Sequence, residues 1–550
     1  MHIVVNKSKH GKKIYNSILL RESFREGGKV KKRTIANLSH CSNEEVEAIA
    51  FALKHKGDLD QLINIKEDVD LQEGLSIGVV WVVYQTARRL GIEKALTSSN
   101  AGKLALWQVI ARVIDQGSRL SAVRLAKVHA ACEILRMTDG FTENALYDNL
   151  AWMSDHQQEI ETRLFHIRKG KAGCRLFLYD VTSSYLEGEK NFFGAYGYNR
   201  DKKRGKKQIV VGLLCDEEGD PVSVAVFSGN TADVQTFAPQ IKKIAQQFGC
   251  TQVTVVGDRG MIKSTQIEQM PDGIHYITAI TKPQIDSLIK GGVIQMGLFD
   301  VRVCEVSSEG VRYILRRNPW RAEEIGQSRM SKRQCVEGLV RQKNDYLEKH
   351  PRAGVETALK EVGQKIEKLR IGKWLGVQAK DRILAIDVDE SVLAEESRLD
   401  GCYVLKTDLA VDSADARTVH DRYLDLQLVE KAFRTCKTSH LEIRPVYVRN
   451  EKSTRGHALV VMLAYLIVRY LQKAWKDFDL TVEEGLNRLS TLSAMEMKIK
   501  GKGSCLKIPQ PREDSQKLLT ALGIRMPRAL PGAGAHVDTR KKLTVRRKSK

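Results

Sequence analysis

Two aspartates stand where apolar runs of the sequence end. Asp180 follows the run "LFLY" (176–179), and Asp258 follows the run "VTVVG" (253–257). Acids at the ends of neighbouring strands can approach each other closely, and their repulsion is costly unless a cation lies between them. Each aspartate alone has a second explanation, because aspartate is common in turns and helix caps. The pattern therefore raises a metal site as one of two hypotheses.

A third acid, Glu430, lies in the segment "RYLDLQLVEKAFRTCK" (422–437). We expect this segment to belong to a long helix that begins near Ala416. Spacings of three and four residues then define one stripe of that helix, which comprises Val419, Tyr423, Leu426, Glu430, Phe433 and Lys437. A carboxylate on a core-facing stripe needs compensation, because burying an unpaired charge is expensive. The alternative is that Glu430 lies at the edge of the stripe in solvent.

The charge balance favours a polyanionic partner. The 550 residues include 89 Lys and Arg against 67 Asp and Glu, which gives a formal net charge of +22. Such a surplus makes nucleic acid the first partner to consider, although a merely basic enzyme has the same composition. The segment "NRDKKRGKK" (199–207) and the tail "HVDTRKKLTVRRKSK" (536–550) concentrate this charge, and we expect the tail to be disordered. We also expect Arg119, Arg124 and Lys127 to be exposed on a helix, where they would either contact DNA phosphates or form an ordinary solvated face.

Other function classes leave no trace in the sequence. The ten cysteines include no Cys-x-x-Cys pair, so neither a zinc knuckle nor a redox pair is predicted, and a reducing cytosol fits. No Walker-type phosphate loop is present, so no bound nucleotide is expected. The apolar segment from Ala458 to Leu471 is interrupted by Arg469 and is too short to span a bilayer, so it is predicted to be a buried helix.

The patterning predicts a mixed α/β protein of several domains. A hairpin is expected around Gly27-Gly28, followed by a helix with Ser42 as N-cap and Glu45 as its capping-box partner. Residues 76–170 are helical in pattern, and strands, helices and further strands follow from about residue 174. The predicted parts are a small N-terminal hairpin and helix (1–75), a helical DNA-binding region (76–170), a first core part (171–283), an inserted domain (284–398), a second core part (399–475), and a C-terminal helical region with a basic tail (476–550).

Several motifs in order resemble the catalytic core of bacterial insertion-sequence transposases of the DDE superfamily. They are "FLYDVTSSYLEG", "GYNRDKKRGKKQIVVGLLCDEEGDPVSVAVFSGNTADVQTF" and "VTVVGDRGM". The segment 423–437 is similar to the Tyr-Arg-Glu-Lys signature of one branch, with Tyr423, Glu430 and Lys437 matching and Leu426 in place of the arginine. The resemblance continues to "KIPQPREDSQKLLTALGI", so it covers nearly the whole chain.

The resemblance implies a ribonuclease H-like mixed sheet flanked by helices, with 284–398 as an insertion between the second and third acids. Asp180, Asp258 and Glu430 would be catalytic and would hold two Mg²⁺ or Mn²⁺ ions, with Asp180 bridging both. Two such ions, about 3.5–4 Å apart, can activate an attacking oxygen and relieve charge on the leaving oxygen. Water would first nick the end of the element, and the freed 3′-hydroxyl would then attack another phosphodiester.

The resemblance also implies partners and DNA-binding residues. The partners would be double-stranded DNA, at the element ends and in the target, and a second copy of the chain on that DNA, in the bacterial cytoplasm. Tyr423 would either pack or contact DNA, and Arg422 or Arg434 would substitute for the arginine missing at Leu426. The DNA-binding candidates are Lys437, Tyr423, Arg259, Lys202, Lys203, Arg204, Lys206, Lys207 and Arg434.

Two other functions remain open at this stage. One is a ribonuclease H-like nuclease that cleaves without strand transfer, although the 423–437 spacing and the long insertion argue against it. The other is a decayed transposase that binds DNA as a regulator without catalysis. The presence of all three acids weighs against decay, whereas Leu426 is a possible lesion.

Overall fold

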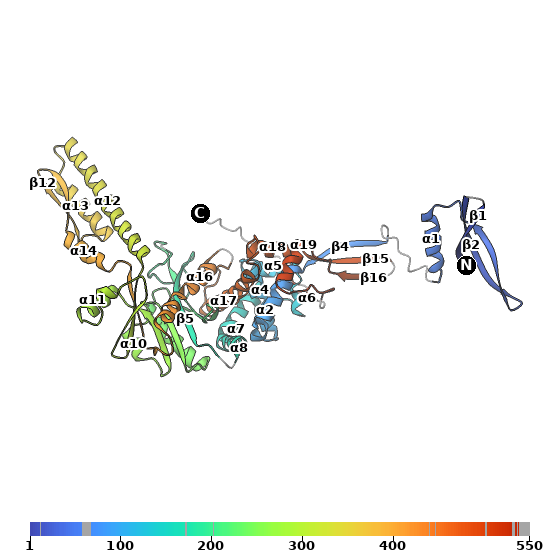
Figure 1. Ribbon diagram of the computed structural model, residues 1–550, viewed down its shortest axis with the longest axis horizontal. Helices are drawn as coiled ribbons and strands as arrows, with labels where there is room; N and C mark the ends of the chain where they lie inside the picture. The colour runs from blue at the N-terminus through green and yellow to red at the C-terminus, as the bar shows by residue number, and fades with distance from the viewer. Residues whose placement is uncertain are drawn as a thin grey trace. The chain divides into compact units, whose positions relative to one another are not determined.

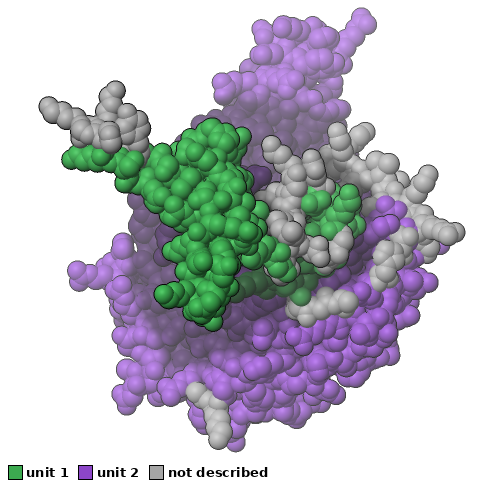
Figure 2. All heavy atoms as spheres, turned by 90° about the vertical axis from the view of Figure 1, so that its right-hand side faces the viewer, with its two compact units in different colours: residues 1–75, 493–509, 527–530 green, residues 76–492, 510–526, 531–550 purple. Residues whose placement is uncertain are grey.

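The computed structural model describes residues 1–10, 13–57, 68–170, 173–201, 203–438, 441–445, 447–500, 503–530, 534–535, 537 and 539. These residues fold into two compact units, which Figure 2 distinguishes by colour. The first unit contains Met1–Leu75, Ser493–Pro509 and Pro527–Leu530. The second contains Ser76–Leu492 and Gln510–Met526 and holds every candidate catalytic residue.

The first unit contains two small antiparallel sheets. Strands β1 (His2–His10), β2 (Lys13–Glu26) and β3 (Lys29–Asn37) form one, and α1 (Asn43–Lys54) follows. Gly27 and Gly28, at φ 61° and 73°, make the predicted hairpin turn, because two consecutive left-handed positions suit glycine. Ser42 and Glu45 form the predicted capping box. The second sheet joins β4 (Val69–Ser76) to β15 (Ser493–Ile499) and β16 (Gly503–Lys507), two strands that lie in a region predicted to be helical.

Helices make up the beginning and end of the second unit. They are α2 (Gly78–Arg89), α3 (Ile92–Leu96), α4 (Asn100–Ile114), α5 (Arg119–Val128), α6 (Ala131–Leu135), α7 (Glu143–Asp155), α8 (Gln157–Lys169), α17 (Glu451–Ala474), α18 (Val482–Ser490) and α19 (Glu513–Ala521). Helix α17 packs against α4, α7 and strand β7. Helix α17 has 24 residues, so it is longer than the predicted apolar segment and, contrary to that expectation, long and apolar enough to cross a membrane. Protein buries 83% of its most apolar window, so it is the predicted buried helix. The expectation of exposed cations on α5 is wrong for Arg119, which is only 5% exposed, whereas Lys127 is exposed.

A mixed eight-stranded sheet forms the centre of the second unit (Figure 1). Its strands are β5 (Leu176–Tyr185), β6 (Gln208–Cys215), β7 (Pro221–Ser228), β8 (Val253–Gly257), β9 (Ile274–Ala279), β10 (Cys304–Ser308), β11 (Val311–Arg317) and β14 (Cys402–Thr407). Their order is β10-β11-β14-β9-β8-β5-β6-β7. Strands β5, β8 and β9 are parallel, and every other neighbouring pair is antiparallel.

Helices cover both faces of this sheet. On one face α8, α9 (Asp233–Lys242) and the π-helical turn η3 (Lys243–Gln247) bury an aromatic cluster that includes Phe165, Phe177, Tyr179 and Phe237. On the other face α16 (Leu426–Lys437) packs against β5, and α17 packs against β7. The short helices α10 (Ser264–Glu268) and α15 (Ala416–Leu424) complete the connections. The sequence therefore folds as the α/β protein that its patterning predicts.

The segment between β9 and β14 divides into two parts. Helix α11 (Lys282–Lys290), the turn η4 (Met296–Leu298) and strands β10 and β11 extend the large sheet and its margin. Helices α12 (Pro319–Lys349), α13 (Val355–Leu369) and α14 (Glu390–Arg398) and the ribbon β12 (Leu375–Lys380)–β13 (Ile383–Val388) have a hydrophobic core of their own. The element with a separate core is therefore narrower than the predicted block 284–398, because the strands β10 and β11 pair within the main sheet.

A buried ion pair connects the helical region to the sheet. The side chain of Glu161 in α8 is fully buried, and Lys243 lies 3.0 Å from its carboxylate. The Ser223 hydroxyl and the Val224 amide of β7 donate to the same carboxylate at 2.9 and 3.2 Å. Each carboxylate oxygen of Glu161 thus has a hydrogen-bond donor or a cation beside it. Removing one partner of the ion pair would leave an unpaired charge in the interior.

We predict that Lys243→Met lowers the free energy of unfolding of this unit by about 3 kcal/mol, because Glu161 loses its cation. Lys242→Met is the matched control, since Lys242 is the preceding residue and is exposed. Urea unfolding followed by circular dichroism measures both variants. Equal stability of the two variants would contradict a structural role for the pair.

Candidate active site

The register of β5 and β8 places the two candidate aspartates side by side. Tyr179 pairs with Gly257 at the end of the parallel ladder, so Asp180 and Asp258 are the next residues on neighbouring strands. Adjacent strands lie about 4.8 Å apart, so the two backbones hold these residues at that spacing. The strand does not end at Asp180 as predicted: it continues to Tyr185, because β6 pairs with it beyond the point where β8 stops.

Strand alternation directs both aspartates to the same face of the sheet. Phe177, Tyr179 and Val181 belong to the buried cluster beneath α9, as do Val253 and Val255 of β8. Because successive side chains of a strand point to opposite faces, Asp180 and Asp258 lie on the opposite face, where α16 packs. Asp180 is half-buried and Asp258 is exposed.

Helix α16 brings the third acid to this face. The predicted long helix is broken at Asp425, which ends α15 and precedes α16. The buried residues of α16 are Val429, Ala432, Phe433 and Cys436. Glu430 is exposed, so it lies at the edge of the apolar stripe, as the alternative interpretation stated. From this edge it faces a cleft rather than the core.

The three acids line one cleft. Its volume is about 350 Å³, and its walls come from β5, the end of β8, the start of α9 and α16. Asp180, Asp258 and Glu430 line it together with Lys437 and Arg434. The fold thus collects five of the residues predicted from the sequence at one place, although Asp258 and Glu430 are separated by 171 intervening residues.

The electrostatics of the cleft favour a bound cation. Burial, followed by the negative charges of Asp258 and Glu430, raises the pKa of the Asp180 carboxyl to about 7. The Val181 amide, which donates to Asp180 Oδ1 at 2.8 Å, and the charge of Arg200 act in the opposite direction. A positive ion among the three carboxylates would remove this repulsion, and carboxylate oxygen is the ligand that hard divalent cations prefer.

Tyr423 contacts the acids directly. Its hydroxyl donates to Asp258 Oδ1 at 3.4 Å, and burial together with the charge of Asp258 raises the pKa of the phenol. Asp258 Oδ1 also accepts the backbone amide of Arg259 at 2.8 Å. The side chain of Arg259 is exposed beside the cleft. Of the two roles left open for Tyr423, packing and contact with DNA, the structure shows the side chain packed and hydrogen-bonded at the second aspartate, and contact with DNA stays a prediction.

Two ion pairs join the basic loop to the cleft. Lys437 Nζ lies 2.8 Å from Asp201 Oδ1, and Asp201 Oδ2 accepts the Tyr185 amide at 3.2 Å. Arg200 lies 2.6 Å from Asp233 at the start of α9. Arg200 and Asp233 line the cleft but were not among the sequence candidates. Both belong to the segment 197–237 that resembles the transposase core, but nothing in the sequence distinguishes them from the other charged residues of that segment.

The remaining basic candidates lie around this loop. Lys203 lies over the Tyr185 ring, Lys206 lies 3.8 Å from Glu187, and Arg204 is exposed. Lys207 is half-buried, and its Nζ donates to the Glu189 carbonyl at 3.4 Å. Lys202 and the basic residues of the tail, which lie in 540–550, fall outside the described residues.

The two arginines proposed to substitute for the one missing at Leu426 lie in different environments. Leu426 is half-buried at the start of α16. Arg434 is exposed and lines the cleft, whereas Arg422 lies 3.4 Å from Asp425. Of the two proposed substitutes, Arg434 is therefore placed to reach a ligand in the cleft.

A second acidic group lies in the turn 216–220 between β6 and β7. Oxygens of its acids at 216, 218 and 220 lie within 4.8 Å of one another. Lys169 lies 3.0 Å from Asp216, and Arg168 lies 2.5 Å from Asp220. These cations from the end of α8 pair with acids of the turn and so connect α8 to the sheet.

Comparison with known proteins agrees with the geometry. Residues 172–467 match the family model of the transposase DDE domain, and residues 3–65 match that of the IS1634 family transposase N-terminal domain. No curated protein matches the chain. The DDE model spans more than half of the 550 residues, from the start of the large sheet to within α17. The chain therefore belongs to the DDE transposases of insertion sequences, which act on DNA.

Proposed function

We propose that the chain cuts and joins the ends of its own insertion sequence, with Asp180, Asp258 and Glu430 as the metal-binding catalytic triad. The observation that carries this proposal is the register of β5 and β8, which sets two aspartates side by side opposite Glu430 of α16. The donor set fits Mg²⁺ or Mn²⁺, because all three ligands are carboxylates. Two such ions, when bound, supply activation of the attacking oxygen and charge relief at the leaving oxygen.

The sheet order supports a ribonuclease H-like core. Strands β7, β6 and β5 form an antiparallel meander, and β8 and β9 continue the sheet in parallel to β5. In this arrangement the first acid lies on the central strand and the second at the end of its parallel neighbour. The third acid comes from a helix that follows the inserted segment. The rigid sheet would hold the aspartates while α16 contributes the remaining ligand.

Basic residues would position the DNA over the acids. Arg434 and Lys437 lie on α16, one and two turns beyond Glu430 respectively, and both line the cleft. Lys437 is paired with Asp201, so a DNA phosphate would compete with that carboxylate for the ammonium group. Tyr423 would hold Asp258 in place through its hydroxyl. The loop 203–207 would track the phosphate backbone nearby.

Because strand transfer joins two ends, we propose that two chains act together on DNA. Mass photometry of the full chain with a duplex that carries the element end should then give a complex of two chains and two duplexes. Complexes with one chain per duplex at every stage of the reaction would contradict the proposal.

We predict that Asp258→Asn lowers Mg²⁺-dependent cleavage of the end duplex by at least about a hundredfold, because one carboxylate ligand is lost. Binding of the same duplex should persist. Asp272→Asn is the control, since Asp272 is exposed and does not line the cleft. A gel-based cleavage assay of both variants measures the effect. Cleavage by Asp258→Asn at the wild-type rate would exclude the triad.

We predict that Lys437→Met weakens cleavage by about tenfold or more, since a charge-assisted contact to a phosphate is worth about 1.5–3 kcal/mol. Lys431→Met should have little effect, because Lys431 is exposed on the same helix but does not line the cleft. Single-turnover cleavage rates compare the two variants. Equal cleavage rates of the two variants would contradict a direct contact between Lys437 and a DNA phosphate.

A further inference from the structure

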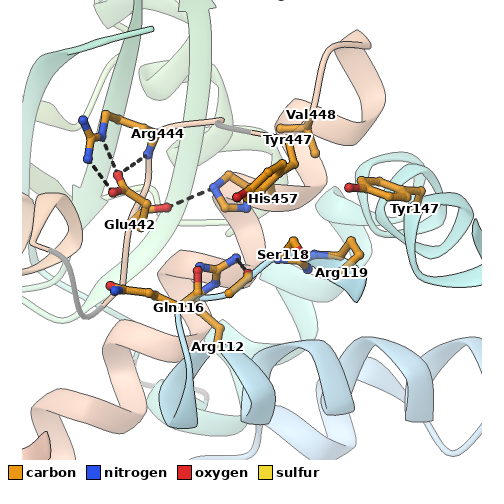
Figure 3. Close-up of a pocket in the computed structure, with 11 residues that line it drawn as sticks. Arg112, Gln116, Ser118, Arg119, Tyr147, Glu442, Arg444, Tyr447, Val448 and His457 are labelled. Carbon is orange, nitrogen blue, oxygen red and sulfur yellow. Dashed lines mark hydrogen bonds and ion pairs between the residues drawn. The ribbon is translucent and has the colours of Figure 1, made fainter. Parts of the chain in front are cut away.

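A second cavity lies outside the catalytic cleft, between the N-terminal helical region and α17 (Figure 3). Its walls are the end of α4, the start of α5, a residue of α7, one residue of α17, and Glu442, Arg444, Tyr447 and Val448. Four of the lining side chains are basic in type: Arg112, Arg119, Arg444 and His457. The acidic side chain in the wall is that of Glu442.

The single acid is already neutralised inside the wall. Arg444 Nε donates to Glu442 Oε1 at 2.6 Å, and its terminal nitrogen lies 2.5 Å from Oε2. Figure 3 shows this paired geometry, with the Glu442 carbonyl turned toward His457. Because one guanidinium binds both oxygens of this carboxylate, the negative charge of Glu442 does little to compensate the other cations of the cavity.

Arg119 is the cation without an acid. Its side chain is buried, with the residue only 5% exposed, and it donates to the neutral side chain of Gln108. Among the described residues no carboxylate lies within ion-pair distance of Arg119, and burial lowers the pKa of its guanidinium to about 10. A buried charge without a counter-ion is expensive, so its retention beside a cavity points to an anion supplied from outside the chain.

Two further features give the cavity a positive potential. Burial and the charges of Arg112 and Arg119 lower the pKa of His457 well below its usual value, so both arginine charges reach the same space. Helix α5, ten residues long, begins at Arg119 with Ser118 as its N-cap, and both residues line the cavity. A helix N-terminus adds partial positive charge at this point.

The size of the cavity limits what can enter. Its volume is about 30 Å³, which is room for about two water molecules, so it can take the two non-bridging oxygens of one backbone phosphate but not a whole phosphate group. A base or a sugar does not fit this space. The cavity thus suits a small oxyanion at its mouth rather than a flipped nucleotide.

The cavity wall is continuous with the catalytic strand. Arg444 lies over the ring of Tyr185, 4.6 Å from its centroid, and donates to its hydroxyl. Tyr185 is the last residue of β5, the strand that carries Asp180. Given the DNA-processing function proposed above, we infer that this cavity binds one backbone phosphate of the bound DNA through Arg119 and thereby sets the position of the duplex relative to the cleft.

Inorganic phosphate is the first probe of this site. The melting temperature of the full chain should rise by about 2 °C or more in saturating phosphate, relative to sodium chloride of equal ionic strength. Arg119→Met should abolish the shift and leave the melting temperature in chloride unchanged or higher, because it removes an uncompensated buried charge. Arg119→Lys should retain part of the shift. Lys127→Met should keep all of it, since Lys127 is exposed on the same helix outside the cavity.

A persistent phosphate shift in Arg119→Met would overturn the proposal. So would a lower melting temperature of that variant in chloride, because Arg119 would then be a structural residue held by Gln108.

The source of the phosphate is tested with an end duplex. In the cleavage-deficient Asp180→Asn background, adding Arg119→Met should reduce the slope of log affinity against log salt by about 0.9, the value for one lost phosphate contact. An unchanged slope would overturn the assignment to the DNA backbone, even if free phosphate binds. This measurement reads binding alone. If Asp180→Asn still cleaves while the slope falls, the catalytic triad fails and the phosphate site stands.

Discussion

The candidate active site depends on the parallel pairing of β5 with β8. That ladder ends at Tyr179 and Gly257, and the next residue on each strand is an aspartate. Two like charges at neighbouring positions repel each other, so the backbone must hold them. The apolar residues on the opposite face of both strands provide this rigidity, because they pack into the aromatic cluster beneath α9. Burial of the carboxyl, and after it the repulsion from Asp258 and Glu430, raises the pKa of Asp180.

The buried side and the exposed edge of helix α16 have different functions. Its buried side, which includes Val429 and Phe433, packs the helix on the face of the sheet that carries the aspartates. Its exposed edge carries Glu430 and, two turns later, Lys437, so a negative and a positive group approach the same cleft. The break at Asp425 separates this helix from α15, so Tyr423 approaches Asp258 from a different helix. Acidic and basic side chains thus line the same cleft.

Buried charges in this protein fall into two groups. Glu161 and Lys243 compensate each other and contribute to the junction between the helical region and the sheet. Arg119 has a neutral partner and faces a cavity, so its charge is available to an anion. The net charge of +22 also favours an anionic partner, because a polyanionic substrate supplies the negative charge that the chain lacks. The Glu161–Lys243 ion pair is therefore part of the folded framework, whereas Arg119 has no acidic partner among the described residues.

The sequence by itself determined the order of the elements around the site and the acids that end up there. Alternation and turn residues predicted β5, β6, β7 and β8, and the resemblance of residues 423–437 to the family signature singled out Glu430 and Lys437. Local patterns carried this information because each strand has one apolar face and each helix one apolar stripe. The same patterns placed Arg119 in solvent, since a basic residue on a short helix looks exposed until its neighbours are known.

Only the tertiary structure could determine pairing and register. No local pattern states that β4 pairs with β15, that β10 and β11 extend the main sheet, or that Asp180 lies beside Asp258. The same holds for the contacts of Lys437 with Asp201 and of Arg200 with Asp233. These features join residues far apart in the chain, and their energies arise from burial and close approach, which exist only once the sheet and its helices have assembled.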